Sequence, residues 1–223
     1  MRKLHVAAFV SLDGVMQAPG GPEEDRSGGF AHGGWVVPKF DEALGEEVDR
    51  FFAPPRALLL GRKTYEIFAA HWPHQNDAFA DALNAMPKYV ATRSPRPLAW
   101  NNSHPIGPDA VSAVRALKAE AGPDLLTQGS SGLIQSLLKA DLVDQFTLLI
   151  FPVVLGSGKR LFHVEAAPAG LRLLGSRTTS QGVVVARYER AGDVSSGSFA
   201  RETPSEDEVK RRADINGKPE DFQ

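Results

Sequence analysis

The chain contains no cysteine among its 223 residues. This absence excludes a disulfide framework, a thiolate nucleophile and any cysteine-ligated metal. A cysteine-free chain fits a reducing compartment, and we therefore expect a cytoplasmic protein.

The chain also lacks an excess of charge and a long apolar run. Its 25 Lys and Arg residues against 27 Asp and Glu give a net charge of −2, which provides no field for nucleic acid or an anionic membrane surface. Residues 1–6 lead directly into a strand-like segment, without a membrane-spanning stretch or a small-residue cleavage site. We expect a mature, soluble chain with neither nucleic acid nor membrane as partner.

A metal site is not indicated either. His71 and His74 are three residues apart, but Pro73 interrupts the helix that would align them, and no acid or third histidine follows at ligand spacing. We therefore expect no metal. Trp72, between the two histidines, is either an aromatic wall of a substrate pocket or a packing residue.

What the chain does have is 42% apolar residues, enough for one well-buried core. Strand-like and helix-like segments alternate, which favours an α/β fold with a mostly parallel central sheet. We expect strands at 4–10, 57–60, 88–92 and 125–127, and helices at 38–52, 64–70, 79–84, 109–120 and 133–138.

The last third has a different character. Residues 145–154 and 182–189 are β-rich with no clear long helix between them, which predicts antiparallel strands at the C-terminal edge of a mixed sheet. We expect residues 1–190 to form the main domain and 191–223 a C-terminal arm. The segment 203–212 has a hydroxyl cap, early acids and late bases, which predicts a short helix; a flexible tail is the alternative.

The most informative motif is Gly61-Arg62-Lys63-Thr64-Tyr65, which follows an apolar strand and opens a helix. A helix N-terminus offers unpaired N–H groups and partial positive charge, so this turn could receive a phosphorylated ligand. The glycines of Gly129-Ser130-Ser131-Gly132, between a strand and a helix, would likewise allow close approach of a pyrophosphate.

Two other glycine-rich segments are less specific. Gly156-Ser157-Gly158-Lys159-Arg160 matches neither a Walker-type loop nor a dinucleotide fingerprint, and we expect a tight turn there. Lys159 and Arg160 are either charged residues at the tip of that turn or contacts for a substrate phosphate. The segment 18–34 is either a mobile lid over a site or an ordinary surface loop.

These motifs together resemble the dihydrofolate reductase superfamily. The residues that carry the resemblance follow successive strands: Gly61 to Tyr65, Thr92-Arg93-Ser94, Gly129 to Gly132, and Pro152 to Gly158. Within the superfamily, Ser11-Leu12-Asp13-Gly14 and residues 152–162 are most similar to the reductase domain of the bifunctional riboflavin-biosynthesis deaminase-reductase. The resemblance covers about residues 4–189.

The resemblance implies an NADPH site across the ends of the sheet. Arg62, Lys63 and Thr64, beside Gly61, would face the cofactor's phosphates, and Thr92 and Arg93 would lie near the adenosine 2′-phosphate, where arginine selects NADP over NAD. The pyrophosphate would meet the backbone of Gly129, Ser130, Ser131, Gly132 and Leu133. The nicotinamide would lie against Ala7 and Ala8, beside the 11–16 loop.

Reduction also needs a proton donor near the nicotinamide. Asp13 is the best placed, for catalysis and substrate contact, although it could merely form a turn with Gly14. By resemblance to dihydrofolate reductases proper, the acid would instead come from the helix before Gly61, near Glu47, with Asp49 competing. Either acid could be part of a solvated helix face.

The departures from the family concern the substrate. No Arg occurs at residues 85–89, where folate enzymes hold the glutamate tail, and the deaminase half of the riboflavin enzyme is missing. The resemblance thus implies an NADPH-dependent reductase of a small cyclic C=N, C=O or pteridine-like substrate, acting as a homodimer. The alternatives are a catalytically silent NADP-binding dimer that acts as a sensor or assembly partner, and a structural homodimer with an unused pocket.

Overall fold

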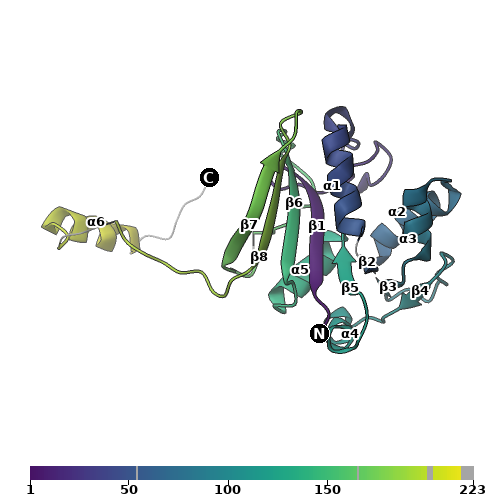
Figure 1. The fold of residues 1–223 in the computed structure, drawn as a ribbon. Coiled ribbons are helices and arrows are strands. Elements are labelled where there is room, and N and C mark those ends of the chain that lie inside the picture. Colours follow the sequence, from purple (N-terminus) through teal and green to yellow (C-terminus); the bar gives the residue numbers. More distant parts are fainter. Residues whose placement is uncertain (54, 165, 200–202, 217–223) are drawn as a thin grey trace. The chain divides into compact units, whose positions relative to one another are not determined.

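A central sheet organises the main part of the molecule, with strand order β4-β3-β2-β5-β1-β6-β8-β7 (Figure 1). The strands are β1 (Leu4–Ser11), β2 (Arg56–Gly61), β3 (Lys88–Ala91), β4 (Ser103–Pro105), β5 (Asp124–Thr127), β6 (Gln145–Phe151), β7 (Leu171–Thr178) and β8 (Val184–Arg190). In this order, neighbouring strands from β4 to β6 are parallel to one another. Strand β8 is antiparallel to β6, and β7 is antiparallel to β8. The predicted mixed sheet with an antiparallel C-terminal edge is therefore confirmed.

This computed structural model describes residues 1–53, 55–164, 166–199 and 203–216, in two compact units, Met1–Gly192 and Asp193–Gln223. The division falls two residues after the boundary expected from the sequence, at 190. In the second unit, α6 (Glu206–Asn216) begins where Ser205 Oγ accepts a hydrogen bond from the Glu208 N–H. Residues 200–202 and 217–223 of the expected arm lie outside the described residues.

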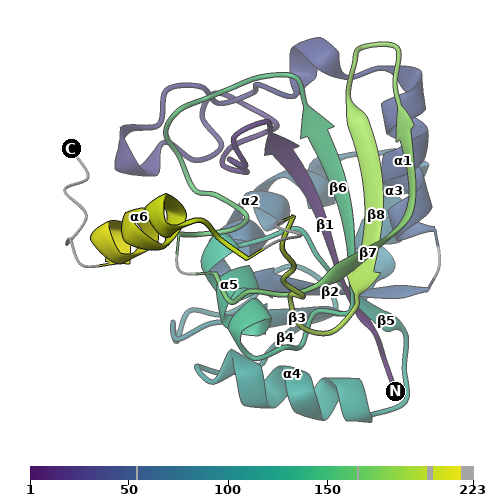
Figure 2. The same ribbon diagram turned by 90° about the vertical axis from the view of Figure 1, so that its left-hand side faces the viewer.

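Helices cover both faces of the sheet. Figures 1 and 2 show α1 (Glu42–Phe52), α2 (Arg62–His71) and α3 (Ala78–Ala85) on one face, and α4 (Ala110–Ala119) and α5 (Ser131–Lys139) on the other. Short 3₁₀ helices lie at Ser27–Gly29, Val37–Lys39 and Trp72–His74.

Alternation along each strand supplies two cores, one under each helix layer. In β1, Ala7 packs on the α1–α3 side, and its neighbours Val6 and Ala8 pack on the α4–α5 side, because successive side chains point to opposite faces. Every helix predicted in the main unit is present, shifted by up to four residues at its ends. Strands β4 and β7 were not predicted: β4 has only three residues, and β7 is exposed along almost its whole length.

The segment after β1 is held by the turn before residue 161. Val15 pairs with Arg160 in an antiparallel bridge, and the Met16 N–H donates to the Lys159 carbonyl at 2.8 Å. A Cβ on Gly158, whose φ is +120°, would lie 2.7 Å from Val15 Cγ1. Glycine is thus required for the close approach of the two segments, and the 156–160 motif is a structural turn.

Candidate active site

The carboxyl ends of β2 and β5 lie side by side, and the glycine motifs that follow them are in contact. The Gly61 N–H donates to the Gly129 carbonyl at 3.2 Å. A Cβ on Gly61 would lie 2.2 Å from Ser130 Oγ, and a Cβ on Gly129 would lie 2.7 Å from Thr64 Oγ1. The two turns can approach this closely because the residues at the contact are small. We call the surface that they form together, residues 61–64 and 128–131, the glycine corner.

The helices that begin at this corner differ from the others in the main unit. Helices α1, α3 and α4 each have an aspartate at the N-cap, Asp41, Asp77 and Asp109, whose side chain accepts a backbone N–H of the first turn. Helices α2 and α5 begin after Gly61 and Ser130, neither of which makes a side-chain cap. Their first-turn N–H groups therefore remain available to a bound anion.

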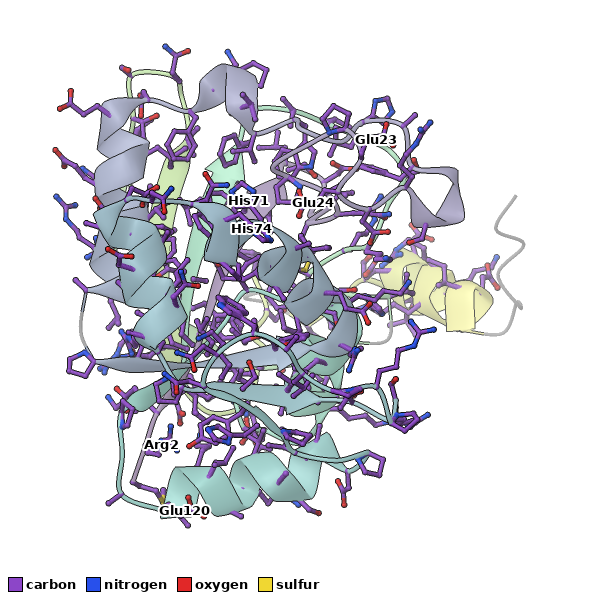
Figure 3. All side chains as sticks on the ribbon, turned by 90° about the vertical axis from the view of Figure 1, so that its right-hand side faces the viewer. Arg2, Glu23, Glu24, His71, His74 and Glu120 are labelled. Carbon is purple, nitrogen blue, oxygen red and sulfur yellow. The ribbon has the colours of Figure 1, made fainter. Side chains whose placement is uncertain are left out.

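A cavity of about 600 Å³ opens beside this corner on the α1–α3 face. Its polar wall comes from the turns after β2 and β5 and includes Lys63, Thr64, Gln128, Gly129, Ser130 and Ser131. The opposite walls come from β1, α1, α2, α3 and the 16–37 segment. Figure 3 shows Glu23, Glu24, His71 and His74 in the upper half of the view, and Arg2 and Glu120 far below them, beside α4.

Of the site residues predicted from the sequence, six line this cavity: Lys63, Thr64, Trp72, Gly129, Ser130 and Ser131. Ala7, expected beside the nicotinamide, lines it too, together with Phe9. The remaining predicted residues lie outside its lining: Ala8, Asp13, Glu47, Gly61, Arg62, Thr92, Arg93, Gly132 and Leu133. The side chains of Ala8 and Leu133 pack in the core under α4 and α5, so any contact of either residue with a cofactor would be through its backbone, as was predicted for Leu133.

The two arginines near the glycine corner, Arg62 and Arg93, differ in whether their side chains have hydrogen-bond partners. Arg62 donates to Glu66 at 2.7 Å and to the Arg96 carbonyl at 3.0 Å. Arg93 is exposed after β3, the strand next to β2. Among the described residues it has no hydrogen-bond or ion-pair partner, so its guanidinium is the more available of the two.

Asp13 has a structural role that the sequence did not reveal. Its carboxylate accepts the Ser11 hydroxyl at 2.6 Å and the N–H groups of Leu155 and Gly156 at 3.1 and 2.9 Å. The Ser11 hydrogen bond, followed by those two backbone bonds, lowers its pKa from 3.8 to about 2 against the opposing effect of burial. These contacts hold the carboxylate against the segment after β6, outside the cavity lining, which argues against the prediction that Asp13 is the acid.

Glu47 likewise lies outside the cavity lining and is held by ion pairs. Its side chain is 1% exposed and lies within 2.6 Å of Arg177 Nε and 3.0 Å of Arg187. Burial alone would raise its pKa, but the Arg187 hydrogen bond and the charges of Arg187 and Arg177 lower it. Glu47 therefore ties α1 to β7 and β8, and this corrects its predicted catalytic role. Nothing in the sequence pointed to these ion pairs, because both arginines lie 130 or more residues after Glu47.

Three other carboxylates do line the cavity: Glu24, Asp25 and Asp49. Asp49 was considered from the sequence, whereas Glu24 and Asp25, in the glycine-rich segment 18–34, were given no role. The only feature of the sequence that pointed to a role for this segment is its position after the first strand, where a loop can fold over a site.

The environments of these acids differ. Burial raises the pKa of Glu24, although its Oε2 accepts the Gly20 N–H at 2.6 Å. Asp25 is paired with Lys159, whose Nζ also donates to Ser27 Oγ at 2.7 Å. Burial would raise the pKa of Asp25, but the hydrogen bonds from Lys159 and Ser27 lower it. Of Glu24 and Asp25, Glu24 is thus the one whose surroundings favour the protonated form.

Trp72 belongs to an aromatic group beside the cavity. Its ring centre lies 5.2 Å from that of Phe79 and 6.4 Å from that of Phe68, and Phe79 meets Phe52 at 5.0 Å. Trp72 is half-buried and contributes to the cavity wall. It therefore both packs against its neighbours and faces the cavity.

Neither a metal centre nor a membrane span is found in the part of the chain that the structure describes. Its histidines and acids form no group of three or more suited to hold a metal ion. Its helices are all too short or too polar to cross a bilayer.

The fold is dihydrofolate-reductase-like, as the resemblance seen in the sequence implied. A family model described as the RibD C-terminal domain matches residues 2–185. The chain belongs to this family of reductase-like proteins. Two relatives from Bacillus subtilis strain 168, both described as uncharacterized, are YwjB, 30% identical over 85% of this chain and 99% of its own length, and YyaP, 26% identical over 86% and 96%.

Solved structures agree on the fold. A protein assigned to riboflavin biosynthesis from Shewanella sp. PV-4 matches 85% of this chain and 99% of its own with a TM-score of 0.59 and 19% identity. A pyrimidine reductase-like protein from Corynebacterium diphtheriae matches 86% and 93%, with a TM-score of 0.59 and 11% identity. Dihydrofolate reductase from Enterococcus faecalis, complexed with NADP(H), matches 84% and 96% with a TM-score of 0.55 and 12% identity.

Proposed function

We propose that the protein is an NADPH-dependent reductase of a small cyclic substrate. The observation that carries this proposal is the pair of uncapped helix N-termini, α2 and α5, that meet at one corner of the cavity. Membership of a reductase-like family supports it, as does the likeness of the fold to a dihydrofolate reductase with NADP(H).

The chemistry of the corner fits a dinucleotide. The pyrophosphate would be held by the first-turn N–H groups of α2 and α5, together with Lys63, Thr64 and Ser131, because N–H dipoles and a cation favour a bound anion. The exposed Arg93 would hold the 2′-phosphate that distinguishes NADPH from NADH. The apolar side chains of β1, Ala7 and Phe9, would line the nicotinamide end.

Bound NADPH would supply a hydride, with its two electrons, for the carbon of a C=N or C=O bond, and would be oxidised to NADP⁺. The chain itself must then provide one proton to the nitrogen or oxygen. We propose Glu24 for this role, because it lines the cavity and burial raises its pKa. The aromatic wall that includes Trp72 would orient the ring and exclude water.

Calorimetry tests the cofactor. NADPH is expected to bind at least ten times more tightly than NADH, and Arg93→Ala is expected to remove most of that preference because it removes the 2′-phosphate contact. Arg96→Ala is the matched control, since Arg96 is also an exposed arginine, three residues along the same loop. Absence of heat with NADPH at millimolar excess would refute the proposal.

The proton donor has its own test. Glu24→Gln keeps an acceptor for the Gly20 N–H but cannot give up a proton, so the rate of NADPH oxidation with a reducible substrate is expected to fall about 100-fold. In the native protein the rate should decline as the pH rises through the raised pKa of Glu24, and the variant should lose that dependence. Glu23→Gln, an exposed neighbour paired with Arg26, is the control.

A homodimer is also proposed. Strand β7 is the edge of the sheet and carries exposed Leu171, Leu173 and Leu174, at 38%, 52% and 50% of their accessible surface. An exposed apolar edge strand favours pairing with a second copy. Light scattering at micromolar concentration should give twice the chain mass, and Leu173→Lys should give the monomer; a wild-type monomer would exclude the pairing.

A further inference from the structure

The part of the cavity away from the glycine corner has a large aromatic and aliphatic wall. Six aromatic side chains line it: Phe9, Phe40, Phe52, Phe68, Trp72 and Phe79. They come from β1, the segment before α1, α1 itself, α2, the 3₁₀ turn Trp72–His74 and α3, so several separate elements contribute apolar groups to one wall. Such a wall favours flat apolar rings.

The charges in this part of the cavity oppose an anion. Among the described lining residues the cations are Lys63, which lies at the glycine corner, and Lys159. Lys159 is neutralised by its ion pair with Asp25 and donates to Ser27, while Glu24 and Asp49 add further acidic groups. A substrate phosphate would therefore meet apolar rings and carboxylates without a free cation, at a high desolvation cost.

The other cation considered for a substrate phosphate is also engaged. Arg160 donates to the Asp13 carbonyl at 2.6 Å and to the Gly156 carbonyl at 3.1 Å, and it does not line the cavity. The turn at residues 156–160 is thus occupied with holding the segment after β1.

We propose that the substrate is an uncharged, mostly apolar ring compound with a reducible C=O or C=N bond and without a phosphate. This rests on the proposed reductase function and narrows its substrate class. Since one cavity of about 600 Å³ must hold both this compound and the reactive end of the dinucleotide, the compound has one or two rings.

A matched pair of ring compounds tests the class in the presence of saturating NADP⁺, which would fill the phosphate-binding corner so that a second phosphate cannot bind there. Calorimetry should show that 1-naphthol binds at least ten times more tightly than 1-naphthyl phosphate, which adds only the charged group. Trp72→Ala should weaken 1-naphthol about tenfold by removing part of the wall. Phe162→Ala, an exposed aromatic outside the cavity, should leave the affinity unchanged.

A second variant tests the electrostatic argument. Asp25→Asn removes the charge that neutralises Lys159, so 1-naphthyl phosphate should bind several times more tightly than to the native protein, while 1-naphthol should be unaffected. The proposal is overturned if the phosphate binds the native protein as well as the naphthol does. It is also overturned if naphthol gives no heat at millimolar concentration, or if Asp25→Asn does not improve phosphate binding. Because NADPH binding is measured separately, failure here is distinct from failure of the reductase proposal.

Discussion

The contact between Gly61 and Ser130 leaves no room for a larger side chain at residue 61 in the proposed cofactor corner. In Gly61→Ala the new Cβ would lie 2.2 Å from Ser130 Oγ, 3.0 Å from its Cβ and 3.1 Å from its backbone nitrogen. Rotation of the serine side chain cannot relieve the last two approaches, so the turn after β5 must move away from the turn after β2.

Overpacking of this kind costs about 2 kcal/mol. For a unit of this size that corresponds to a fall in melting temperature of roughly 4–8 °C. The displaced turns should also bind NADPH at least ten times more weakly, because the N-termini of α2 and α5 would no longer converge.

A double-mutant cycle isolates the contact. Ser130→Gly removes the side-chain atoms that collide, so it should restore most of the stability lost in Gly61→Ala, and the costs of the two single changes should not add. For thermal unfolding alone, Gly132→Ala is the matched control, because a Cβ at this position in helix α5 would have nothing within 4 Å and alanine favours the helix. Thermal unfolding that leaves Gly61→Ala as stable as the native protein would refute the reasoning.

Three further outcomes are expected. Lys88, fully buried, donates through Nζ to three backbone carbonyls at 2.8–3.0 Å, so Lys88→Met should cost about 3 kcal/mol of unfolding free energy in urea; a loss below about 1 kcal/mol would contradict this. Burial, followed by the charge of Arg56, lowers the pKa of His5 from 6.5 to about 4. The unfolded chain therefore takes up the proton first as the pH falls from 6.5 to about 4, and about 3 kcal/mol of stability is lost; a pH dependence of unfolding that His5→Gln leaves unchanged would contradict this. Glu47→Gln should lose about 2 kcal/mol of stability yet keep the rate of NADPH oxidation, as Asp13→Asn should, and a large loss of rate in either variant would return that residue to the mechanism.

Much of the fold could be predicted because the signals are local. The alternation of apolar strands with capped amphipathic helices indicates the parallel sheet, and aspartates such as Asp41 and Asp77 stand where helices begin. The strands that escaped prediction, β4 and β7, lack such a signal: one is very short, and the other lies exposed at an edge where packing imposes no pattern.

The acids could not be assigned from the sequence. Asp13 was chosen for its place beside the expected nicotinamide, and Glu47 for its resemblance to the acid of dihydrofolate reductases. Both carboxylates are held by partners far along the chain, in the segment 155–160 for Asp13 and in β7 and β8 for Glu47. Glu24 lay unnoticed in a glycine-rich loop. The pKa of each depends on burial and on neighbours that only folding brings close.

The sequence by itself determined the family, the α/β architecture and the glycine turns Gly61–Thr64 and Gly129–Ser131, because strand and helix periodicity and small residues at turns are local properties of the chain. Only the tertiary structure decided which side chains share a cavity, which carboxylate is free to hold a proton and which cations are already paired. Those properties arise from contacts between residues that are remote in sequence, and no local pattern encodes them.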